Sequence, residues 1–294
     1  MPHVVQLSPS ENPARDDGIR TRLRELGYVE GRNIRLEFRD TAGNVDGLPA
    51  LDEQLVQEGG IDVILAISTP AAWAAQRATQ TIPIVAFAAV DPVASGRAKS
   101  LAHPGGNATG IAILFEETTV KRVELMREVV PHAVRLATVV TKVSNGPQSL
   151  GPVLETGRKL GFAVEVISID DPADLAKALS PKAISGFDAF VFVPDVVLGT
   201  YAAQLIKLVS NKPAIFPSPD WVDNGVLMSF GPNMTDATDH LIAQLDRVLE
   251  GAKPSDLPFE CPTKFDLRIN LRTARKLGIE LSPMLIARAH KVIE

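Results

Sequence analysis

The sequence predicts an α/β protein built from two lobes. Short apolar runs alternate with longer amphipathic stretches along almost all of the 294 residues, which is the pattern of βα units with parallel sheets. A loop rich in Gly and Pro at residues 103–110 interrupts this rhythm, and the rhythm then starts again. We therefore expect two α/β lobes of similar size, with a chain that crosses between them more than once.

The first lobe is expected to alternate strands and helices. The expected strands are residues 3–8, 34–41, 62–68, 83–90 and 111–115, and the expected helices are residues 14–26, 48–58 and 71–79. Residues 62–68 are continuously apolar, as in a strand that is buried on both faces. Thr69 and Pro70 supply an N-cap and a proline at the first helical position, so a helix should begin abruptly there.

The second lobe repeats the pattern. Its expected strands are residues 135–141, 163–169, 187–193, 214–217 and 226–230, and its expected helices are residues 121–130, 150–160, 174–179 and 201–210. A helix is expected next at residues 236–249. Residues 253–262 are expected to be extended, and a last strand–helix unit follows them. Ser282 and Pro283 predict the start of a closing helix, whose apolar face would carry Leu285, Ile286, Ala289, Val292 and Ile293.

The composition limits the possible partners. Hydrophobic residues make up 45% and charged residues 22%, so the chain can bury a sizeable core. The net charge of -5 provides no general attraction for phosphate, so nucleic acid is not an expected partner. The longest apolar run, residues 82–90, is about half of the roughly 18 to 20 residues that a membrane span needs, so no membrane insertion is expected.

The sequence contains none of the common catalytic or cofactor motifs. It has no GxGxxG or GxxxxGK[ST] loop, no GxSxG or SxxK nucleophile motif, and no HExxH pair among its five histidines. Cys261 is the only cysteine, which excludes an intramolecular disulfide and a cysteine zinc cluster. We therefore expect no enzyme, no cofactor and no metal. The N-terminal residues also show no export signal.

Polar residues follow the predicted strands. Ligands of open parallel sheets bind outside the carboxyl ends of the strands, so these residues are candidates for ligand contact. The candidates are Ser8, Ser10, Ser68, Thr69 and Asp91 in the first lobe, Ser144, Asn145, Asp195, Asp220 and Trp221 in the second, and Phe115 beside the junction.

Each candidate also has a purely structural interpretation. Thr69 lies at a helix N-terminus, where unpaired N–H groups attract a carboxylate, but every helix favours such a capping residue. The three Asp carboxylates could receive a ligand ammonium, or they could bond their own backbone in turns. Phe115 and Trp221 could stack on a ligand ring or pack within the protein.

Several blocks of the sequence resemble the ABC transporter substrate-binding proteins related to the tryptophan and tyrosine importers. They are residues 23–34 (LRELGYVEGRNI), 68–72 (STPAA), 81–85 with 91–93, 104–110 (PGGNATG), 225–232 (GVLMSFGP), and 262–271 with 273–274. The similarity covers nearly the whole chain. Residues 143–147 (VSNGP) depart from the family's usual Asn-Pro-x-Asn-Pro loop.

The resemblance implies a type I periplasmic binding protein fold. In that fold two Rossmann-like lobes with parallel sheets are joined by a three-crossing hinge and close around a ligand. Lobe 1 would hold residues 1–115 and about 231–260, and lobe 2 residues 116–230 and about 261–294. The cleft residues implied by the resemblance are Ser68, Thr69, Asp91, Ser144, Asn145, Asp195 and Asp220.

The leading functional hypothesis is a solute-binding receptor of an ABC importer. It would bind a small carboxylate, an aromatic amino acid or a related aromatic acid, in the interlobe cleft and pass it to the transporter permease. The resemblance implies a periplasmic monomer. The alternative is a ligand-sensing module of the same fold that signals to a protein partner, and a hydrolase or lyase is disfavoured because nucleophile and metal motifs are missing.

Overall fold

The chain passes three times between two structural units. Unit 1 contains Met1–Leu114 and Met234–Pro262, and unit 2 contains Phe115–Asn233 and Thr263–Glu294. The computed structural model describes residues 1–88, 90–141 and 150–294, without the side chains of Val196 and Asp220. In these ranges no helix is both long and apolar enough to cross a bilayer.

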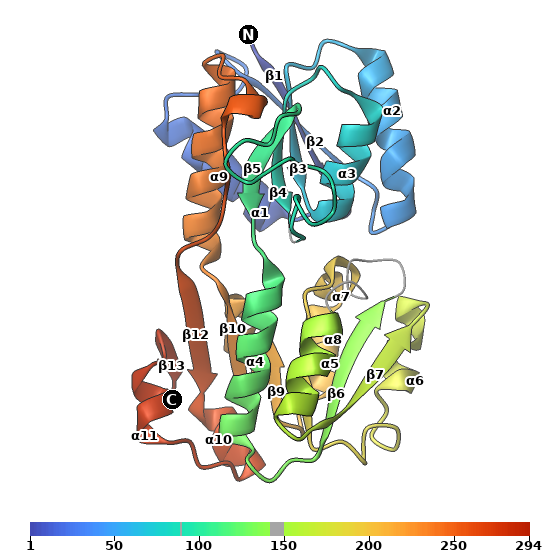
Figure 1. Ribbon diagram of the computed structural model, residues 1–294, viewed down its shortest axis with the longest axis vertical. Helices are drawn as coiled ribbons and strands as arrows, with labels where there is room; N and C mark the ends of the chain where they lie inside the picture. Colours follow the sequence, from blue (N-terminus) through green and yellow to red (C-terminus); the bar gives the residue numbers. More distant parts are fainter. Residues whose placement is uncertain (89, 142–149) are drawn as a thin grey trace. The chain divides into compact units, whose positions relative to one another are not determined.

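Unit 1 is built on a parallel sheet with the strand order β11-β5-β4-β3-β1-β2 (Figure 1). The strands are β1 (His3–Ser8), β2 (Arg35–Asp40), β3 (Val63–Ile67), β4 (Ile84–Ala88), β5 (Ala108–Ala112) and β11 (Phe259–Glu260). Nearly all residues of β1, β3, β4 and β5 are buried, which is why most of them are apolar instead of alternating. The buried polar exceptions are His3, Gln6, Ser8 and Thr109.

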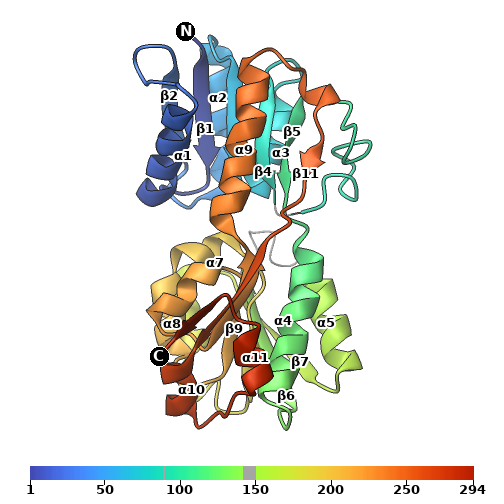
Figure 2. The same ribbon diagram turned by 90° about the vertical axis from the view of Figure 1, so that its left-hand side faces the viewer.

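Helices cover both faces of this sheet. They are α1 (Pro13–Glu25), α2 (Leu48–Glu58), α3 (Thr69–Ala78) and α9 (Met234–Leu249), with short 3-10 turns η1 (Val45–Gly47) and η5 (Pro254–Asp256). The two views in Figures 1 and 2 show α1 and α9 on one face and α2 and α3 on the other. Strands β4 and β5 approach so closely that a Cβ at Gly110 (φ 136°) would lie 2.0 Å from the Ala86 carbonyl oxygen. Only glycine fits there.

Unit 2 has a sheet with the strand order β13-β12-β10-β9-β8-β6-β7. The strands are β6 (Arg135–Thr141), β7 (Ala163–Ile169), β8 (Ala189–Val191), β9 (Ala214–Phe216), β10 (Met228–Pro232), β12 (Phe265–Asn270) and β13 (Lys291–Ile293). Neighbouring strands are parallel except for β10 and β12. The antiparallel pair departs from the wholly parallel sheet expected from the sequence.

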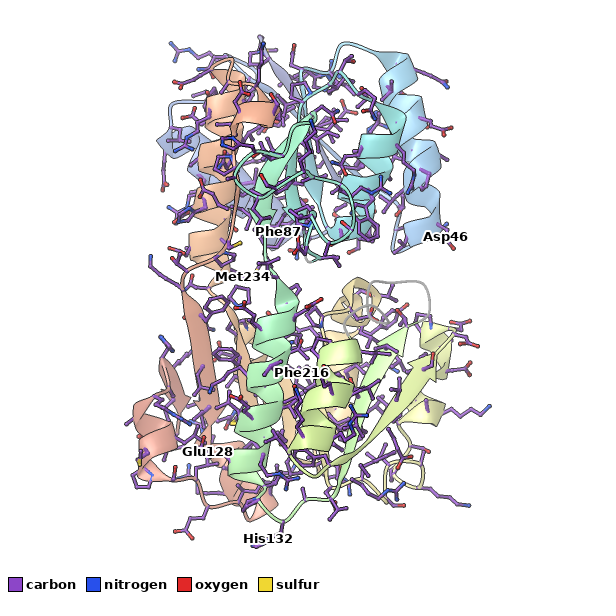
Figure 3. The ribbon with its side chains drawn as sticks, in the orientation of Figure 1. Asp46, Phe87, Glu128, His132, Phe216 and Met234 are labelled. Carbon is purple, nitrogen blue, oxygen red and sulfur yellow. The ribbon has the colours of Figure 1, made fainter. Side chains whose placement is uncertain are left out.

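Two hydrophobic cores lie on opposite faces of this sheet. The helices are α4 (Phe115–Val129), α5 (Leu150–Lys159), α6 (Leu175–Ala178), α7 (Val196–Thr200), α8 (Ala202–Leu208), α10 (Leu271–Leu277) and α11 (Pro283–Ala287), with 3-10 turns η3 (Pro172–Asp174) and η4 (Pro219–Asn224). Alternate residues of β8 enter different cores, with Val191 facing α4 and α5 and Phe190 facing α6 to α8. Phe192 stacks on Phe216, 4.1 Å between ring centroids, inside unit 2 (Figure 3).

The three largest differences from the predicted boundaries concern β5, α4 and the closing helix. The strand expected at residues 111–115 is β5, which lies at Ala108–Ala112, and the helix expected at residues 121–130 starts already at Phe115. The closing helix ends at Ala287 instead of continuing to Ile293. Val292 and Ile293 belong to β13, which pairs with Ile269 and Asn270 of β12.

Asp52 is an exception to the apolar interior of unit 1. Leu48, Asp52 and Leu55 lie on the buried face of α2, and Asp52 is 0% exposed. Neither carboxylate oxygen has a hydrogen-bond partner among the residues that the structure describes. Burial raises the pKa of Asp52 to about 7, although Arg77 on α3 acts in the opposite direction. The folded protein therefore binds a proton at Asp52 more tightly than the unfolded chain does.

We expect Asp52→Asn to change how stability depends on pH. In the wild-type protein this group stabilises the fold below about pH 4, and the stabilisation is lost as the pH rises to about 7, by up to about 4 kcal/mol for a shift of roughly three pKa units. The neutral amide removes this loss, so the variant should be the more stable protein at pH 8. Urea unfolding at pH 4, 6 and 8 measures the difference. The exposed neighbour provides a control, Glu53→Gln, which should follow the wild type; parallel pH profiles for all three proteins would contradict the prediction.

Candidate functional site

The candidate residues of unit 1 lie at one edge of its sheet. Ser8 ends β1, Ser68 and Thr69 follow β3, and Asp91 follows β4. These three strands are neighbours and parallel, so their carboxyl ends meet. The Ser68 N–H donates to the Phe87 carbonyl (3.1 Å), and Phe87 lies near the end of β4 (Figure 3).

Ser68 holds a strained backbone conformation at this edge. Its φ of 134° and ψ of 160° belong to a region that only glycine adopts readily. Its hydroxyl accepts a hydrogen bond from the Ala71 N–H (3.2 Å), so it caps α3. Strain of this kind persists where the surrounding structure enforces it and is concentrated at binding sites.

Thr69 begins α3 and is 1% exposed. Its hydroxyl accepts a hydrogen bond from the Val90 N–H (3.2 Å), which ties the start of α3 to the segment after β4. The N-terminus of α3 carries the partial positive charge of the helix dipole, which favours an anion such as a carboxylate.

Asp91 forms a turn but keeps one oxygen available. Its Oδ1 accepts from the N–H groups of Val93 (2.7 Å) and Ala94 (3.2 Å), as the turn interpretation predicts. No described residue donates to Oδ2. The carboxylate can therefore shape the turn and still accept a hydrogen bond from an ammonium group.

Ser8 and Ser10 orient an arginine that the sequence interpretation missed. The Ser8 hydroxyl donates to the Ser10 carbonyl (2.9 Å) and accepts from Nη2 of Arg15 (3.1 Å). Arg15 also pairs with Asp16 (2.9 Å). These contacts hold a guanidinium beside the end of β1. The signal in the sequence was a basic residue in the first turn of a helix, where acidic residues are favoured.

In unit 2, Asp195 is a structural anchor. Its Oδ1 accepts from the N–H groups of Val197 and Leu198 (both 3.0 Å), and its Oδ2 accepts from the Thr141 N–H (2.7 Å). The Thr141 hydroxyl donates to the same carboxylate. Because Thr141 ends β6, the buried carboxylate joins the end of that strand to the start of α7.

The other candidates of unit 2 are placed only in part. Trp221 packs on Phe216, with 4.9 Å between ring centroids, so packing within the unit accounts for much of its surface. Phe115 is half-buried at the first turn of α4. Asp220 lies in η4, and its side chain is outside the described structure, as are Ser144 and Asn145.

The structure describes no site for a metal ion. Among residues 1–88, 90–141 and 150–294, no group of three or more His, Cys, Asp or Glu side chains could hold one. A groove of about 620 Å³ lies elsewhere in unit 2, where it is lined by His132, Asp188 and Lys212 among others, and none of the candidate residues lines it.

Two α/β units joined by three chain crossings, with polar groups and helix N-termini at the carboxyl edges of their sheets, define the class of the type I periplasmic binding proteins. The chain belongs to the ABC transporter substrate binding protein family, which residues 5–293 match. The family consists of solute-binding proteins. The resemblance expected from the sequence blocks is therefore confirmed.

Similar proteins cover almost the whole chain. A tyrosine-binding protein of Clostridioides difficile strain R20291 is 27% identical over 276 residues, which are 92% of this chain and 78% of that protein. The crystal structure of an ABC domain in complex with L-Trp from Streptococcus pneumonia is 25% identical, with a TM-score of 0.89 and 99% of each chain covered. A conserved domain protein from Vibrio cholerae is 27% identical, with a TM-score of 0.90 and the same coverage.

We expect Ser68→Gly to stabilise the protein and Ser68→Ala to destabilise it. Glycine relieves strain of about 1–3 kcal/mol and sacrifices only a few tenths as a cap, whereas alanine keeps the strain and loses about 1 kcal/mol of capping. Urea unfolding measures both changes. Ser282→Gly is the matched control because Ser282 also caps a helix, with an ordinary φ of -66°, and it should lower stability slightly. The prediction is wrong if the two glycine variants change stability in the same direction.

Removal of the Asp195 carboxylate should destabilise unit 2 strongly. Asp195→Ala leaves three backbone N–H groups without their acceptor in a buried position, so we expect a loss of about 3–5 kcal/mol. Asp171→Ala removes an exposed carboxylate that accepts only from the Ala173 N–H and should lose about 1 kcal/mol or less. Denaturant unfolding compares the two variants, and losses of equal size would show that the Asp195 contacts contribute little.

Proposed function

We propose that this protein is the receptor of an ABC importer for an aromatic amino acid. The observation that carries the proposal is the identity of its relatives. One is a tyrosine-binding protein and another was crystallised with L-Trp, and each similarity spans more than nine-tenths of this chain. The proposal places the protein in the periplasm as a monomer that passes its ligand to a membrane permease and leaves the ligand unchanged.

The chemistry at the edge of the unit 1 sheet fits an amino acid. The N-terminus of α3 and the guanidinium of Arg15 provide positive potential for a carboxylate. Oδ2 of Asp91 provides an acceptor for an ammonium group. In this proposal Thr69 and Arg15 orient the carboxylate, and Asp91 receives the amino group.

A panel of ligands tests the substrate class. Thermal shift and calorimetry with L-tryptophan, L-tyrosine, L-phenylalanine, their hydroxy-acid analogues, sugars and nucleosides should show binding for the aromatic amino acids. A ligand at 100 times its Kd stabilises the folded state by about 2.7 kcal/mol. A response only to sugars or nucleosides would overturn the proposed ligand class, and chemical conversion of a bound ligand would overturn the proposal that the protein is not an enzyme.

Asp91→Asn separates recognition of the amino group from folding. The amide keeps an oxygen for the Val93 and Ala94 N–H groups but removes the negative charge, so affinity for L-tryptophan should fall about tenfold, the value of one charged hydrogen bond. Affinity for indole-3-lactate, which has a hydroxyl in place of the ammonium, should stay within about twofold. Asp171→Asn is the control at a turn of unit 2. Equal losses for both ligands would show that Asp91 does not recognise the ammonium group.

A further inference from the structure

Arg122 is a buried cation without a carboxylate partner. It lies on α4, is 0% exposed, and is among the largest fully buried side chains of the protein. Burial lowers the pKa of its guanidinium to about 9, so the group is charged at pH 7. No Asp or Glu of the described residues pairs with Arg122, and its Nε has no acceptor.

The guanidinium instead bonds neutral oxygens on two elements. Nη2 donates to the Thr119 hydroxyl (2.6 Å), and Nη1 donates to the Thr118 hydroxyl (3.4 Å), both on α4. Nη1 also donates to the carbonyl oxygen of Phe230 on β10 (3.0 Å), and α4 lies against β10 (Figure 1). A buried unpaired charge costs several kcal/mol, and an apolar side chain of similar volume is often at least as stabilising. Net stabilisation therefore does not explain the presence of Arg122, and its role follows from the elements that it joins, α4 and β10.

The Phe230 carbonyl lies where β10 loses one of its neighbours. Strand β9 pairs with β10 only at Met228 and Ser229. On the other side, Phe230 lies opposite Leu267, whose own N–H and carbonyl bond to His290 and so point away from β10. The Phe230 carbonyl consequently faces the position beyond the end of β9, and Arg122 is its partner there.

The elements that Arg122 joins also carry the chain between the two units. Helix α4 begins at Phe115, the first residue after the first crossing. Strand β10 ends one residue before the last residue of unit 2 at the second crossing, Asn233. The segment after the third crossing is held to β10 by the Asn233 N–H, which donates to the Lys264 carbonyl (2.9 Å), and by the ladder to β12. The hydrogen bond from Arg122 to Phe230 connects α4 to β10, and so to the segment after the third crossing.

We propose that Arg122 is a positioning residue that makes all three crossing segments leave unit 2 as one rigid body. The inference rests on the proposed ligand binding only in its consequence, which is that a rigid origin for the crossings slows ligand release. The hydrogen bond to Phe230 carries this role, because the Asn233–Lys264 hydrogen bond and the β10–β12 ladder do not involve Arg122.

Arg122→Met tests the proposal in the full chain. Methionine fills a similar apolar volume and removes the charge and the bond to Phe230. Arg127→Met is the matched control on the same helix. Arg127 is half-buried over the Phe162 ring, and it donates to the carbonyls of Pro131 and Ala133, at the end of α4 away from the crossings.

Hydrogen exchange of the ligand-free protein is the first measurement. In Arg122→Met, peptides that cover residues 115–119 and 229–233 should exchange about tenfold faster, as expected for the loss of one hydrogen bond to a charged group, while peptides of β6 and β8 stay unchanged. Arg127→Met should leave both crossing peptides at the wild-type rate. The proposal is overturned if these peptides of Arg122→Met exchange at the wild-type rate, whether or not any ligand binds.

Ligand release is the second measurement and distinguishes positioning from stability. The dissociation rate of L-tryptophan should rise about tenfold in Arg122→Met while the Tm of the free protein changes by no more than in Arg127→Met. Equal dissociation rates in the two variants, or a rate increase that simply follows a lower Tm in both, overturns the proposal. If the wild-type protein binds no aromatic amino acid, the proposed function has failed, and hydrogen exchange alone decides the role of Arg122.

Discussion

Burial of both faces of a largely parallel sheet is the constraint on which both units depend. Helices cover each face, so the central strands are buried and mostly apolar. The polar candidate residues lie at the edges where strands end. In parallel sheets those ends coincide with the N-termini of the following helices, so capping groups, turn carboxylates and helix dipoles gather at one edge.

Four residues of the two units depart from ordinary apolar packing or backbone geometry. Ser68 keeps an unfavourable backbone conformation while capping α3, and Asp195 is a buried carboxylate whose oxygens are both used by N–H groups. Arg122 is a buried charge whose bonds all go to neutral oxygens. Asp52 differs from all three because its oxygens have no hydrogen-bond partner among the described residues and burial raises its pKa. It lowers the stability of the fold near neutral pH and does not link two elements.

Two carboxylates at the ends of strands differ in how many of their oxygens accept hydrogen bonds within the protein. Turn formation and ligand recognition are often treated as alternatives for an Asp after a strand. Asp91 uses one oxygen for its turn and leaves the other without a donor among the described residues, whereas Asp195 uses both. The sequences around the two residues do not reveal this difference, because it depends on whether a second element supplies a donor. For Asp195 that donor is Thr141, which is 54 residues away in the chain.

The amino-acid sequence alone was sufficient for most of the strands and helices, the two-lobed α/β class, the family and the edges that carry polar residues, because these follow from local periodicity, capping residues and short motifs. Only the tertiary structure decided that Arg15 lies beside the end of β1, that Ser68 is strained, and that residues 291–293 form a strand. Val292 and Ile293 suit the apolar face of a helix equally well, and their pairing with β12 decides between the two. A local pattern records which face of an element is buried, but the partner that buries it comes from a distant part of the chain.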